Sequence, residues 1–325
     1  MKKYYGIDWL RAIACIGIMM MHMIANNTYE ISGFVYSKLI PSFTDFVYLF
    51  MAVSAFGMCY GYFDKVMSAE VNWTTFYKKR YGKVLPFFLF LIIIDLVLNW
   101  GPNSPYEAIM ESTLLHGFIP YTFSVIGVAW FLGTVFIFYL VFPFFCVLIE
   151  RRSRAWCAFA VSLVLNYICS AYFDVPRSNF VYSLCFFLSG GLVFLYKDTL
   201  AKIKWYFYLP IIASSAALYF LIGANTYTRL LLTIALLSFA LSINCGKVRI
   251  ISTISNVSME FYLSHMVIFR GIEKLHLNTL WGNGWLQFLI TVLLVFVGTM
   301  AFSLCFHKLI NIAQRILKKK GNKAV

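Results

Sequence analysis

Ten long apolar stretches run along this chain, and they restrict its possible folds more than any other feature. The stretches lie near residues 8–25, 43–63, 84–100, 127–149, 156–173, 180–196, 205–223, 228–245, 254–272 and 284–309. A helix rises about 1.5 Å per residue, so stretches of this length can cross a hydrocarbon core of about 30 Å. We therefore expect an all-α polytopic membrane protein of about ten transmembrane helices, with a single membrane domain over residues 1–325.

The composition and the distribution of charge favour a membrane protein with both termini in the cytoplasm. The chain is 61% hydrophobic and only 12% charged, whereas soluble domains are about 25% charged. Its net charge of +14 comes from short Lys and Arg runs, most of them in loops on the same side as the N-terminus. This bias is typical of cytoplasmic loops, not of a surface that binds nucleic acid. No small-residue cleavage site follows the first stretch, so we expect it to act as an uncleaved signal anchor.

The first apolar stretch, residues 4–24, carries three ionisable side chains: Asp8, Arg11 and His22. Such groups are costly in a membrane helix unless they face the protein interior or a wet cavity. Arg11 and His22 are eleven residues apart, which leaves them about 20° out of register and about 16 Å apart along an ideal helix. They share one face, which Asp8 joins at the start of the helix, near the positive end of its dipole. This face is a candidate functional site.

The segment IDWLRAIACIGIMMMH, residues 7–22, resembles the beginning of the membrane acyltransferase-3 family. Members of this family begin with an Asp, two residues, an Arg, ten residues and a His. The family transfers acyl groups from acyl-coenzyme A to hydroxyls of glycans, lipids or small molecules. The resemblance implies that His22, Arg11 and Asp8 are catalytic.

Two further segments in the first third of the chain resemble the same family. LFMAVSAFGMCYGY, residues 49–62, is similar to a second-span segment that ends in Ser-Gly-Phe, with Ala55 in place of the glycine. Alanine is still small enough for close helix packing. Ser54 of this segment is a candidate for lining the substrate site.

The basic segment FYKKRYGKVLPFF, residues 76–88, is similar to the family's pattern of Arg, two residues, Arg, then Pro. Arg80 matches the first Arg, and Lys83 stands in place of the second. Lysine attracts phosphate as a point charge but cannot bind it through two parallel hydrogen bonds. Together with Lys78 and Lys79, these residues are candidates for binding the phosphates of the acyl donor. The alternative is an ordinary cytoplasmic cluster that contacts anionic lipid.

Two later segments supply candidates for lining the substrate site. Residues 128–145 are similar to a Trp-Phe-Leu segment with a later Tyr and Pro, but Val135 stands where many members have a glutamate. The alternative for the aromatic residues of this segment is an aromatic belt or core packing. Residues 258–269, SMEFYLSHMVIF, resemble a late segment with Ser, Tyr-Leu and His. The candidates from both segments are Trp130, Tyr139, Ser258, Glu260, Tyr262 and His265.

The other titratable residues carry weaker signals. Asp45 and Asp95 are expected within or at the ends of spans, and His116, His276 and His307 are expected to be solvated or interfacial. The eight cysteines show no metal-ligand spacing and are interpreted as small packing residues. We expect no metal and no tightly bound cofactor, with acetyl-coenzyme A as a co-substrate.

Together these features predict a membrane O-acyltransferase with acetyl-coenzyme A as the expected donor and His22 as the general base. The expected acceptor is a hydroxyl of a cell-surface or lipid-linked glycan. The chain resembles the short, stand-alone branch of the family, which implies a multi-pass protein of the bacterial inner membrane. Direct attack on the donor and an acyl-His22 intermediate both remain open. The alternative function is a secondary transporter of a small anionic or sugar-like solute.

Overall fold

The computed structural model describes residues 3–98, 100–119, 121 and 125–321, and all regular elements in these ranges are helices. In chain order they are α1 (Tyr5–Ala25), η1 (Val35–Leu39), α2 (Ile40–Ser42), η2 (Phe43–Asp45), α3 (Phe46–Met67), α4 (Trp73–Leu98), α5 (Ser104–Ser112), η3 (His116–Phe118), α6 (Trp130–Ile149), α7 (Arg152–Ala171), α8 (Phe180–Leu195), α9 (Lys197–Leu200), η4 (Trp205–Phe207), α10 (Tyr208–Ile222), α11 (Thr226–Ser242), α12 (Arg249–Asn256), α13 (Ser258–Lys274) and α14 (Trp285–Gly321).

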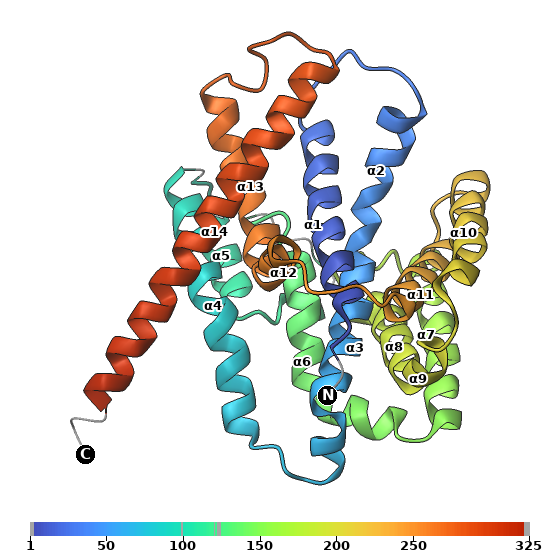
Figure 1. Ribbon diagram of the computed structural model, residues 1–325. Helices are drawn as coiled ribbons and strands as arrows, with labels where there is room; N and C mark the ends of the chain where they lie inside the picture. The colour runs from blue at the N-terminus through green and yellow to red at the C-terminus, as the bar shows by residue number, and fades with distance from the viewer. Residues whose placement is uncertain (1–2, 99, 120, 122–124, 322–325) are drawn as a thin grey trace.

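The helices run up and down between two ends of the molecule, and both chain termini lie at the lower end in Figure 1. The chain ascends through α1, returns through α3 and ascends again through α4. Near the other end of the chain, α13 ascends and α14 descends beside it (Figure 1). The pairs α3 with α8, α7 with α8, and α10 with α11 pack side by side.

Helix α1 lies at the centre of the packing, in contact with α3, α11, α12, α13 and α14. A glycine permits one of these close approaches. A Cβ atom at Gly6 would collide with the backbone carbonyl of Ala240 in α11. Small residues that let helix backbones approach closely are typical of helix contacts in membranes. The central position of α1 exposes its polar face to other helices instead of lipid.

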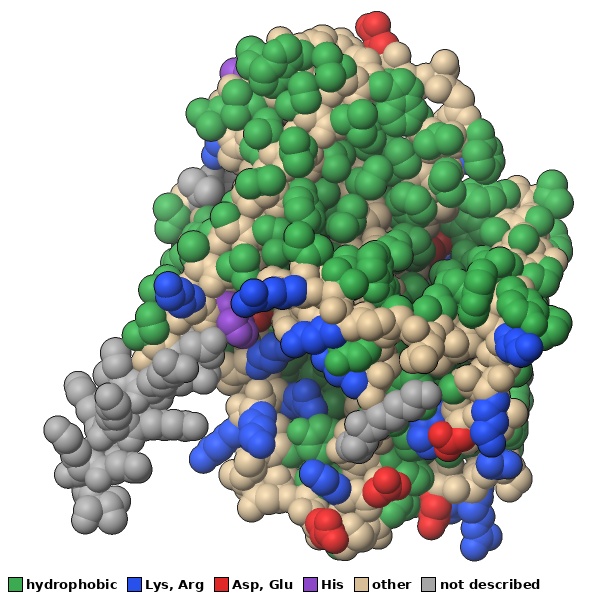
Figure 2. Space-filling model, in the orientation of Figure 1, with side chains coloured by type: hydrophobic (Ala, Val, Ile, Leu, Met, Phe, Trp, Pro, Cys, Tyr) green, Lys and Arg blue, Asp and Glu red, His purple; other side chains and the backbone are tan. Residues whose placement is uncertain are grey.

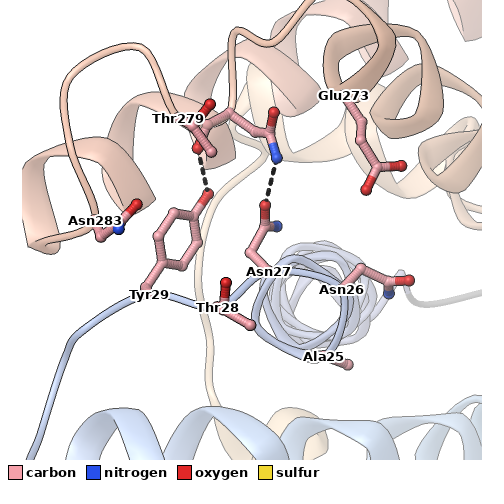
Figure 3. A pocket seen from close by; sticks show the side chains of 9 residues that line it. Ala25, Asn26, Asn27, Thr28, Tyr29, Glu273, Thr279 and Asn283 are labelled. Atoms are coloured by element: carbon pink, nitrogen blue, oxygen red, sulfur yellow. Dashed lines mark hydrogen bonds between the residues drawn. The ribbon is translucent and has the colours of Figure 1, made fainter.

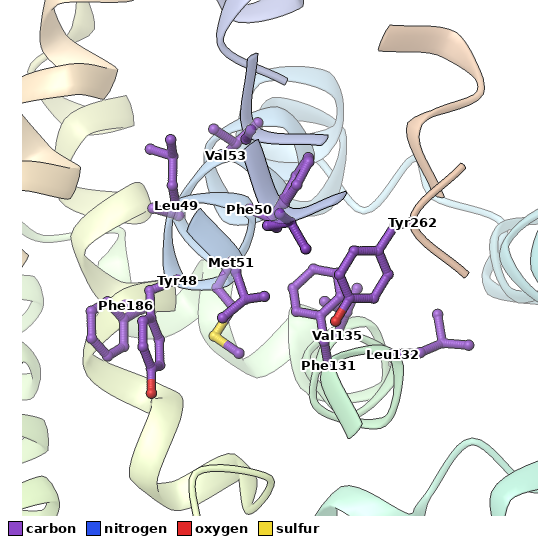
Figure 4. Packing of buried hydrophobic residues seen from close by; sticks show 14 of the residues in the cluster. Tyr48, Leu49, Phe50, Met51, Val53, Phe131, Leu132, Val135, Phe186 and Tyr262 are labelled. Carbon is purple, nitrogen blue, oxygen red and sulfur yellow. The ribbon is translucent and has the colours of Figure 1, made fainter. Parts of the chain in front are cut away.

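An aromatic core joins α3, α6, α8 and α13. Tyr48 of α3 stacks on Phe186 of α8 with ring centroids 4.2 Å apart, and Phe131 of α6 meets Tyr262 of α13 edge to face at 5.2 Å (Figure 4). Phe50 of α3 contacts both rings of that second pair. Rings that interlock in this way hold the four helices in fixed relative positions.

Six helical stretches in the described part of the chain are long and apolar enough to cross a membrane. They are Tyr5–Ala25, Val35–Met67, Trp130–Ile149, Arg152–Ala171, Trp205–Ile222 and Trp285–Ile310. The protein is therefore an all-α polytopic membrane protein, as the sequence predicts. The other four predicted spans correspond to α4, α8, α11 and the α12–α13 region, which are not among these six; α8 and α11 are apolar but have fewer than 18 residues.

Two predicted spans differ in extent from the helices of the structure. The third predicted span, 84–100, is part of a longer helix that begins at Trp73, because the basic segment before it is helical too. The ninth, 254–272, is not one helix: α12 ends at Asn256 and α13 begins at Ser258, with Val257 between them outside helical geometry. This break lets the polar helix α12 and the helix α13 each pack against α1.

The visible face of the molecule is divided by residue type. Figure 2 shows hydrophobic side chains covering the upper half, whereas Lys and Arg side chains gather over the lower half, which is hollowed between them. An apolar band with a basic zone on one side is the arrangement expected of a membrane protein whose basic end faces the cytoplasm.

Candidate active site

The predicted site residues fall into two groups that α1 connects. We call His22, Tyr262 and His265 the histidine cluster, and Arg11, Ser54, Arg80 and Tyr139 the arginine cluster. The histidine cluster lies where the upper part of α1 meets α13, and the arginine cluster lies between the lower part of α1, α3, α4 and α6. Eleven residues of α1 separate the two, which is about 16 Å along the axis.

The two histidines of the histidine cluster lie next to each other. The His22 and His265 rings have centroids 5.0 Å apart and planes tilted by 44°. The Nδ1 of His265 lies 2.6 Å from the carbonyl oxygen of Tyr262. Because a carbonyl only accepts hydrogen bonds, this Nδ1 must carry a proton. The Nε2 of His265 is then an acceptor in the neutral ring, and it is buried without a hydrogen-bond partner among the described residues.

Tyr262 attaches this cluster to the start of α6. Its hydroxyl donates a hydrogen bond of 2.9 Å to the carbonyl of Val128, and its ring is buried. The backbone position that fixes His265 is therefore itself fixed by a second helix. A buried hydroxyl with a satisfied partner is costly to displace, which favours one arrangement of the cluster.

A cavity of about 910 Å³ opens onto His22. Its walls combine aliphatic side chains such as Leu263 and Met266 with a few charged ones, including Asp95, Arg270 and Lys274. This volume is at the upper end of the range for small-molecule sites, and a mostly apolar wall with a few polar groups is their usual chemistry. The remaining lining residues are Asn26, Ile94, Ser104, Val125, Ile126, Gly127, Val128, Val267 and Gly271.

The loop before α8 contributes a cation that the sequence did not indicate as a site residue. The guanidinium of Arg177 lies over the indole ring of Trp130, 5.0 Å from its centroid. Arg177 also interacts electrostatically with His22 and Tyr262. The only sequence signal was its position as an isolated arginine in a loop otherwise poor in basic residues. Trp130, a predicted lining residue, thus positions a charge near the histidine cluster.

The arginine cluster is built around aromatic rings. The guanidinium of Arg80 lies 5.1 Å from the ring centroid of Tyr62, 5.3 Å from that of Phe76 and 5.4 Å from that of Tyr139. These rings come from α3, α4 and α6, so they fix the side chain from three sides. The Nε of Arg80 is buried without a hydrogen-bond partner among the described residues. The cage therefore leaves a hydrogen-bond donor unused.

Tyr139 brings the two arginines of this cluster together. Its hydroxyl interacts electrostatically with both Arg80 and Arg11 and with the side chain of Ser54. Arg11 also lies against α3, where a Cβ atom at Gly57 would be 3.3 Å from one of its terminal nitrogens. The sequence predicted these four residues separately, as a catalytic, a donor-binding and two lining residues, and the fold assembles them.

Three predicted donor-binding residues lie outside this cage. Lys78, Lys79 and Lys83 are all exposed, whereas Arg80 is half-buried. Asp8 lies below Arg11, where it accepts a hydrogen bond of 2.9 Å from Ser255 of α12. Lys3 is 3.6 Å from its other carboxylate oxygen.

The remaining predicted lining residues lie apart from both clusters. The carbonyl of Ser258 accepts a hydrogen bond of 3.4 Å from the thiol of Cys15. Glu260 is 5% exposed and faces His307, whose Nδ1 is 3.6 Å from one carboxylate oxygen. Their polar groups therefore make helix contacts at the base of α13 and do not line the cavity at His22.

The prediction for His116 was wrong. This residue is 2% exposed, and its Nε2 lies 3.1 Å from the carbonyl oxygen of Ala129. It is buried because the segment between α5 and α6 folds back against α6, which apolar periodicity does not reveal. Asp45, expected near a span end, forms a half-buried ion pair with Arg229, with 2.9 Å between Oδ2 and Nε.

Two of the eight cysteines do not fit the packing interpretation. Cys157 and Cys305 are exposed, whereas Cys15, Cys59 and Cys146 are buried. In a membrane protein, an exposed apolar position on a span faces lipid, so these two thiols need no packing partner.

Comparison with known proteins assigns the family. A family model described as an acyltransferase domain matches residues 4–307. Searches of curated proteins and of solved structures found no match. The matched range includes every candidate residue of both clusters, and it favours the acyltransferase over the transporter. The chain therefore belongs to the acyltransferase-3 family and is a multi-pass membrane acyltransferase.

Proposed function

We propose that this protein is a membrane O-acyltransferase that moves an acyl group from acyl-coenzyme A, with acetyl-coenzyme A as the expected donor, to a glycan hydroxyl. The acceptor is a cell-surface or lipid-linked glycan. The observation that carries this proposal is the pair of polar clusters on one helix: a cationic cluster toward the basic end and an imidazole cluster that opens onto a large cavity.

In this proposal, the arginine cluster binds the donor. Coenzyme A carries phosphates, and guanidinium groups bind phosphate oxygens through charge-assisted hydrogen bonds. Arg80 is preorganised by three rings, and its buried Nε makes no hydrogen bond to the described residues. Lys78, Lys79 and Lys83 contribute longer-range attraction from exposed positions. The pantetheine arm then extends past Arg11 along α1, so that the thioester lies near His22.

The histidine cluster carries the proposed chemistry. His22 accepts the proton of the acceptor hydroxyl as its oxygen attacks the thioester carbonyl. The tetrahedral intermediate collapses, the carbon–sulfur bond breaks, and the leaving thiolate takes the proton from the His22 imidazolium. His265 acts as a positioning residue, since its contact with His22 and its bond to the Tyr262 carbonyl restrain the catalytic ring. In the alternative route, His22 is acylated first and then passes the group to the acceptor.

The proposed topology follows the distribution of charge. The basic end, with both termini, faces the cytoplasm, where coenzyme A is available, and the ten predicted spans include α4, α8, α11 and α13. The acceptor enters the cavity at His22 from the opposite side. The expected location is the bacterial inner membrane.

The proposal is tested with protein purified in detergent, acetyl-coenzyme A and a bacterial membrane glycan fraction. Release of free coenzyme A and acetyl incorporation into the glycan are measured together, with and without the acceptor. We expect both signals to depend on acceptor and on His22. Donor hydrolysis without incorporation, or no coenzyme A release with any hydroxyl acceptor, would contradict the proposal. Protein that carries the acetyl group after a rapid quench in the absence of acceptor would indicate the acyl-His22 route.

A further inference from the structure

A second cavity, of about 440 Å³, lies at the upper end of α1, opposite the basic end. It is formed by the residues that follow α1, by the last turns of α13 and by the loop before α14. In Figure 3, Asn27 and Tyr29 point toward the loop that carries Thr279, and Glu273 points from α13 toward the end of α1. The lining residues are Ala25, Asn26, Asn27, Thr28, Tyr29, Glu273, Asn278, Thr279 and Asn283.

The lining of this cavity is polar and almost uncharged. Four of its nine residues are asparagines, and two are threonines. Amides and hydroxyls both donate and accept hydrogen bonds, as sugar hydroxyls do. The one ionisable acid or base among them, Glu273, already pairs with Arg270 at 2.6 Å. No Lys or Arg belongs to the described lining, and a single carboxylate does not form a cation site.

A network of hydrogen bonds fixes most of these side chains in place. The amide of Asn278 donates to Asn27 at 2.7 Å, and the hydroxyl of Tyr29 donates to Thr291 at 2.9 Å. In contrast, the exposed side chains of Thr28 and Asn283 make no hydrogen bond to other described residues. A rigid wall with a few unused donors and acceptors is preorganised for a polar ligand, because little ordering is left to pay for on binding.

This cavity adjoins the one at His22. Asn26 lines both, and its side-chain amide donates 2.9 Å to the backbone carbonyl of His22. Arg270 donates to the amide oxygen of Asn26 at 3.1 Å and belongs to the His22 cavity. A ligand bound in the polar cavity would therefore lie one helical turn from the proposed base.

We propose that the polar cavity is a binding subsite for a neutral saccharide unit of the acceptor. This inference rests on the proposed function, since it assigns the acceptor's sugar to this cavity and the reacting hydroxyl to His22. The asparagine and threonine side chains hydrogen-bond the sugar hydroxyls, and the ring of an uncharged sugar needs no countercharge. An anionic sugar is disfavoured by Glu273 and by the lack of a lining cation.

The first experiment measures binding without catalysis. Saturation-transfer NMR is recorded on full-length protein in a sugar-free detergent, because maltoside headgroups would compete. The probes are methyl α-glucoside and methyl N-acetyl-β-glucosaminide, with glucose 1-phosphate as the anionic comparison. The variants are Thr28→Val with Asn283→Ala, and Ser37→Ala as a control at an exposed hydroxyl outside the cavity.

We expect both neutral glycosides to give saturation transfer in the wild type and in the control. The double variant should weaken their binding at least about fivefold, since two hydrogen-bonding groups are lost. Absence of signal with both neutral glycosides, equal signal in the double variant, or stronger binding of the phosphate would each overturn the subsite.

The second experiment separates this inference from the proposed function. Acyl transfer to the glycan fraction is measured with the same variants, and KM is determined for donor and acceptor. The subsite predicts a raised acceptor KM with an unchanged donor KM. Transfer with a wild-type acceptor KM in the double variant overturns the subsite and leaves the acyltransferase proposal intact. Binding of neutral sugars without any acyl transfer would support the subsite and contradict the acyltransferase proposal.

Discussion

Replacing Arg80 with alanine should weaken binding of the acyl donor more than any other change in the basic segment. Arg80 is held by three rings at 5.1, 5.3 and 5.4 Å, so its guanidinium is ordered before the donor arrives. A hydrogen bond to a charged group contributes about 1.5–3 kcal/mol. Because about 1.4 kcal/mol is a tenfold change in affinity, Arg80→Ala should weaken coenzyme A binding by about 10- to 150-fold.

The exposed lysines should contribute less to donor affinity than Arg80. Lys83 is exposed, and interactions between exposed charges are worth about 0–1 kcal/mol, so Lys83→Ala should change donor affinity by less than about fivefold. Its effect should also decrease with added salt, which screens exposed charges more than the half-buried Arg80. Lys83→Arg restores the residue that the family has at this position and should preserve or improve donor binding.

The assay is calorimetric titration of coenzyme A at two salt concentrations, with donor KM measured in parallel. Arg152→Ala is a matched control, because this guanidinium also lies over a ring, 4.9 Å from the centroid of Tyr196, but in α7 away from the cluster. Unchanged donor affinity in correctly folded Arg80→Ala protein would refute the donor site. A larger loss for Lys83→Ala than for Arg80→Ala would refute the argument from the aromatic cage.

Three further predictions concern other groups. Arg11→Lys keeps the charge but loses the planar guanidinium, so acyl transfer should fall with normal insertion; wild-type activity would exclude a two-point contact. Asp45→Asn leaves the half-buried Arg229 without its carboxylate partner and should lower stability by about 1.5–3 kcal/mol, measured by thermal unfolding in detergent; no change would mean that the pair is solvated. Glu111→Gln should stabilise the protein increasingly as pH rises from about 5 to 8, measured in the same way.

The reason for the last prediction is the burial of Glu111 in α5, in the connection between the expected spans 84–100 and 127–149. Burial raises the pKa of this carboxyl to about 8 from its ordinary value of 4.5, although the backbone N–H of Ile126 donates to it. Between these two pH values the folded state binds more protons than the unfolded state, so stability falls as pH rises, by at most about 1.4 kcal/mol per unit. Glutamine does not titrate and can still accept the Ile126 bond. Parallel pH profiles of wild type and variant would contradict this reasoning.

The sequence predicted the helical membrane architecture because its signal is local. Apolar length alone places α1 and α6 and the start of α14 within a few residues, and the family model confirms the resemblance that began at Asp8. The roles of His22 and Arg80 stay predictions. Their assembly into clusters around His265 and Tyr139 depends on which helix faces meet, and single-chain periodicity carries no such information.

The errors have specific physical causes. The break at Val257 has no proline or glycine to announce it, and it lets the polar helix α12 pack against α1. His116 looked solvated because its neighbours are loop residues, but the loop folds into the protein. Arg177 looked like an ordinary loop charge, and only the fold places it over Trp130.

The most direct test of the account is the loss of the proposed base. His22→Asn keeps a hydrogen-bonding side chain on α1 but has no basic nitrogen, and His276→Asn makes the same change at an exposed position, with φ of 55°, that asparagine tolerates. Acetyl transfer to the glycan fraction is measured for both at saturating donor. General-base catalysis is typically worth about 10²–10⁴-fold, so His22→Asn should lose at least that factor while His276→Asn stays near wild type. More than about one tenth of wild-type transfer by folded His22→Asn protein would contradict the assignment of the base.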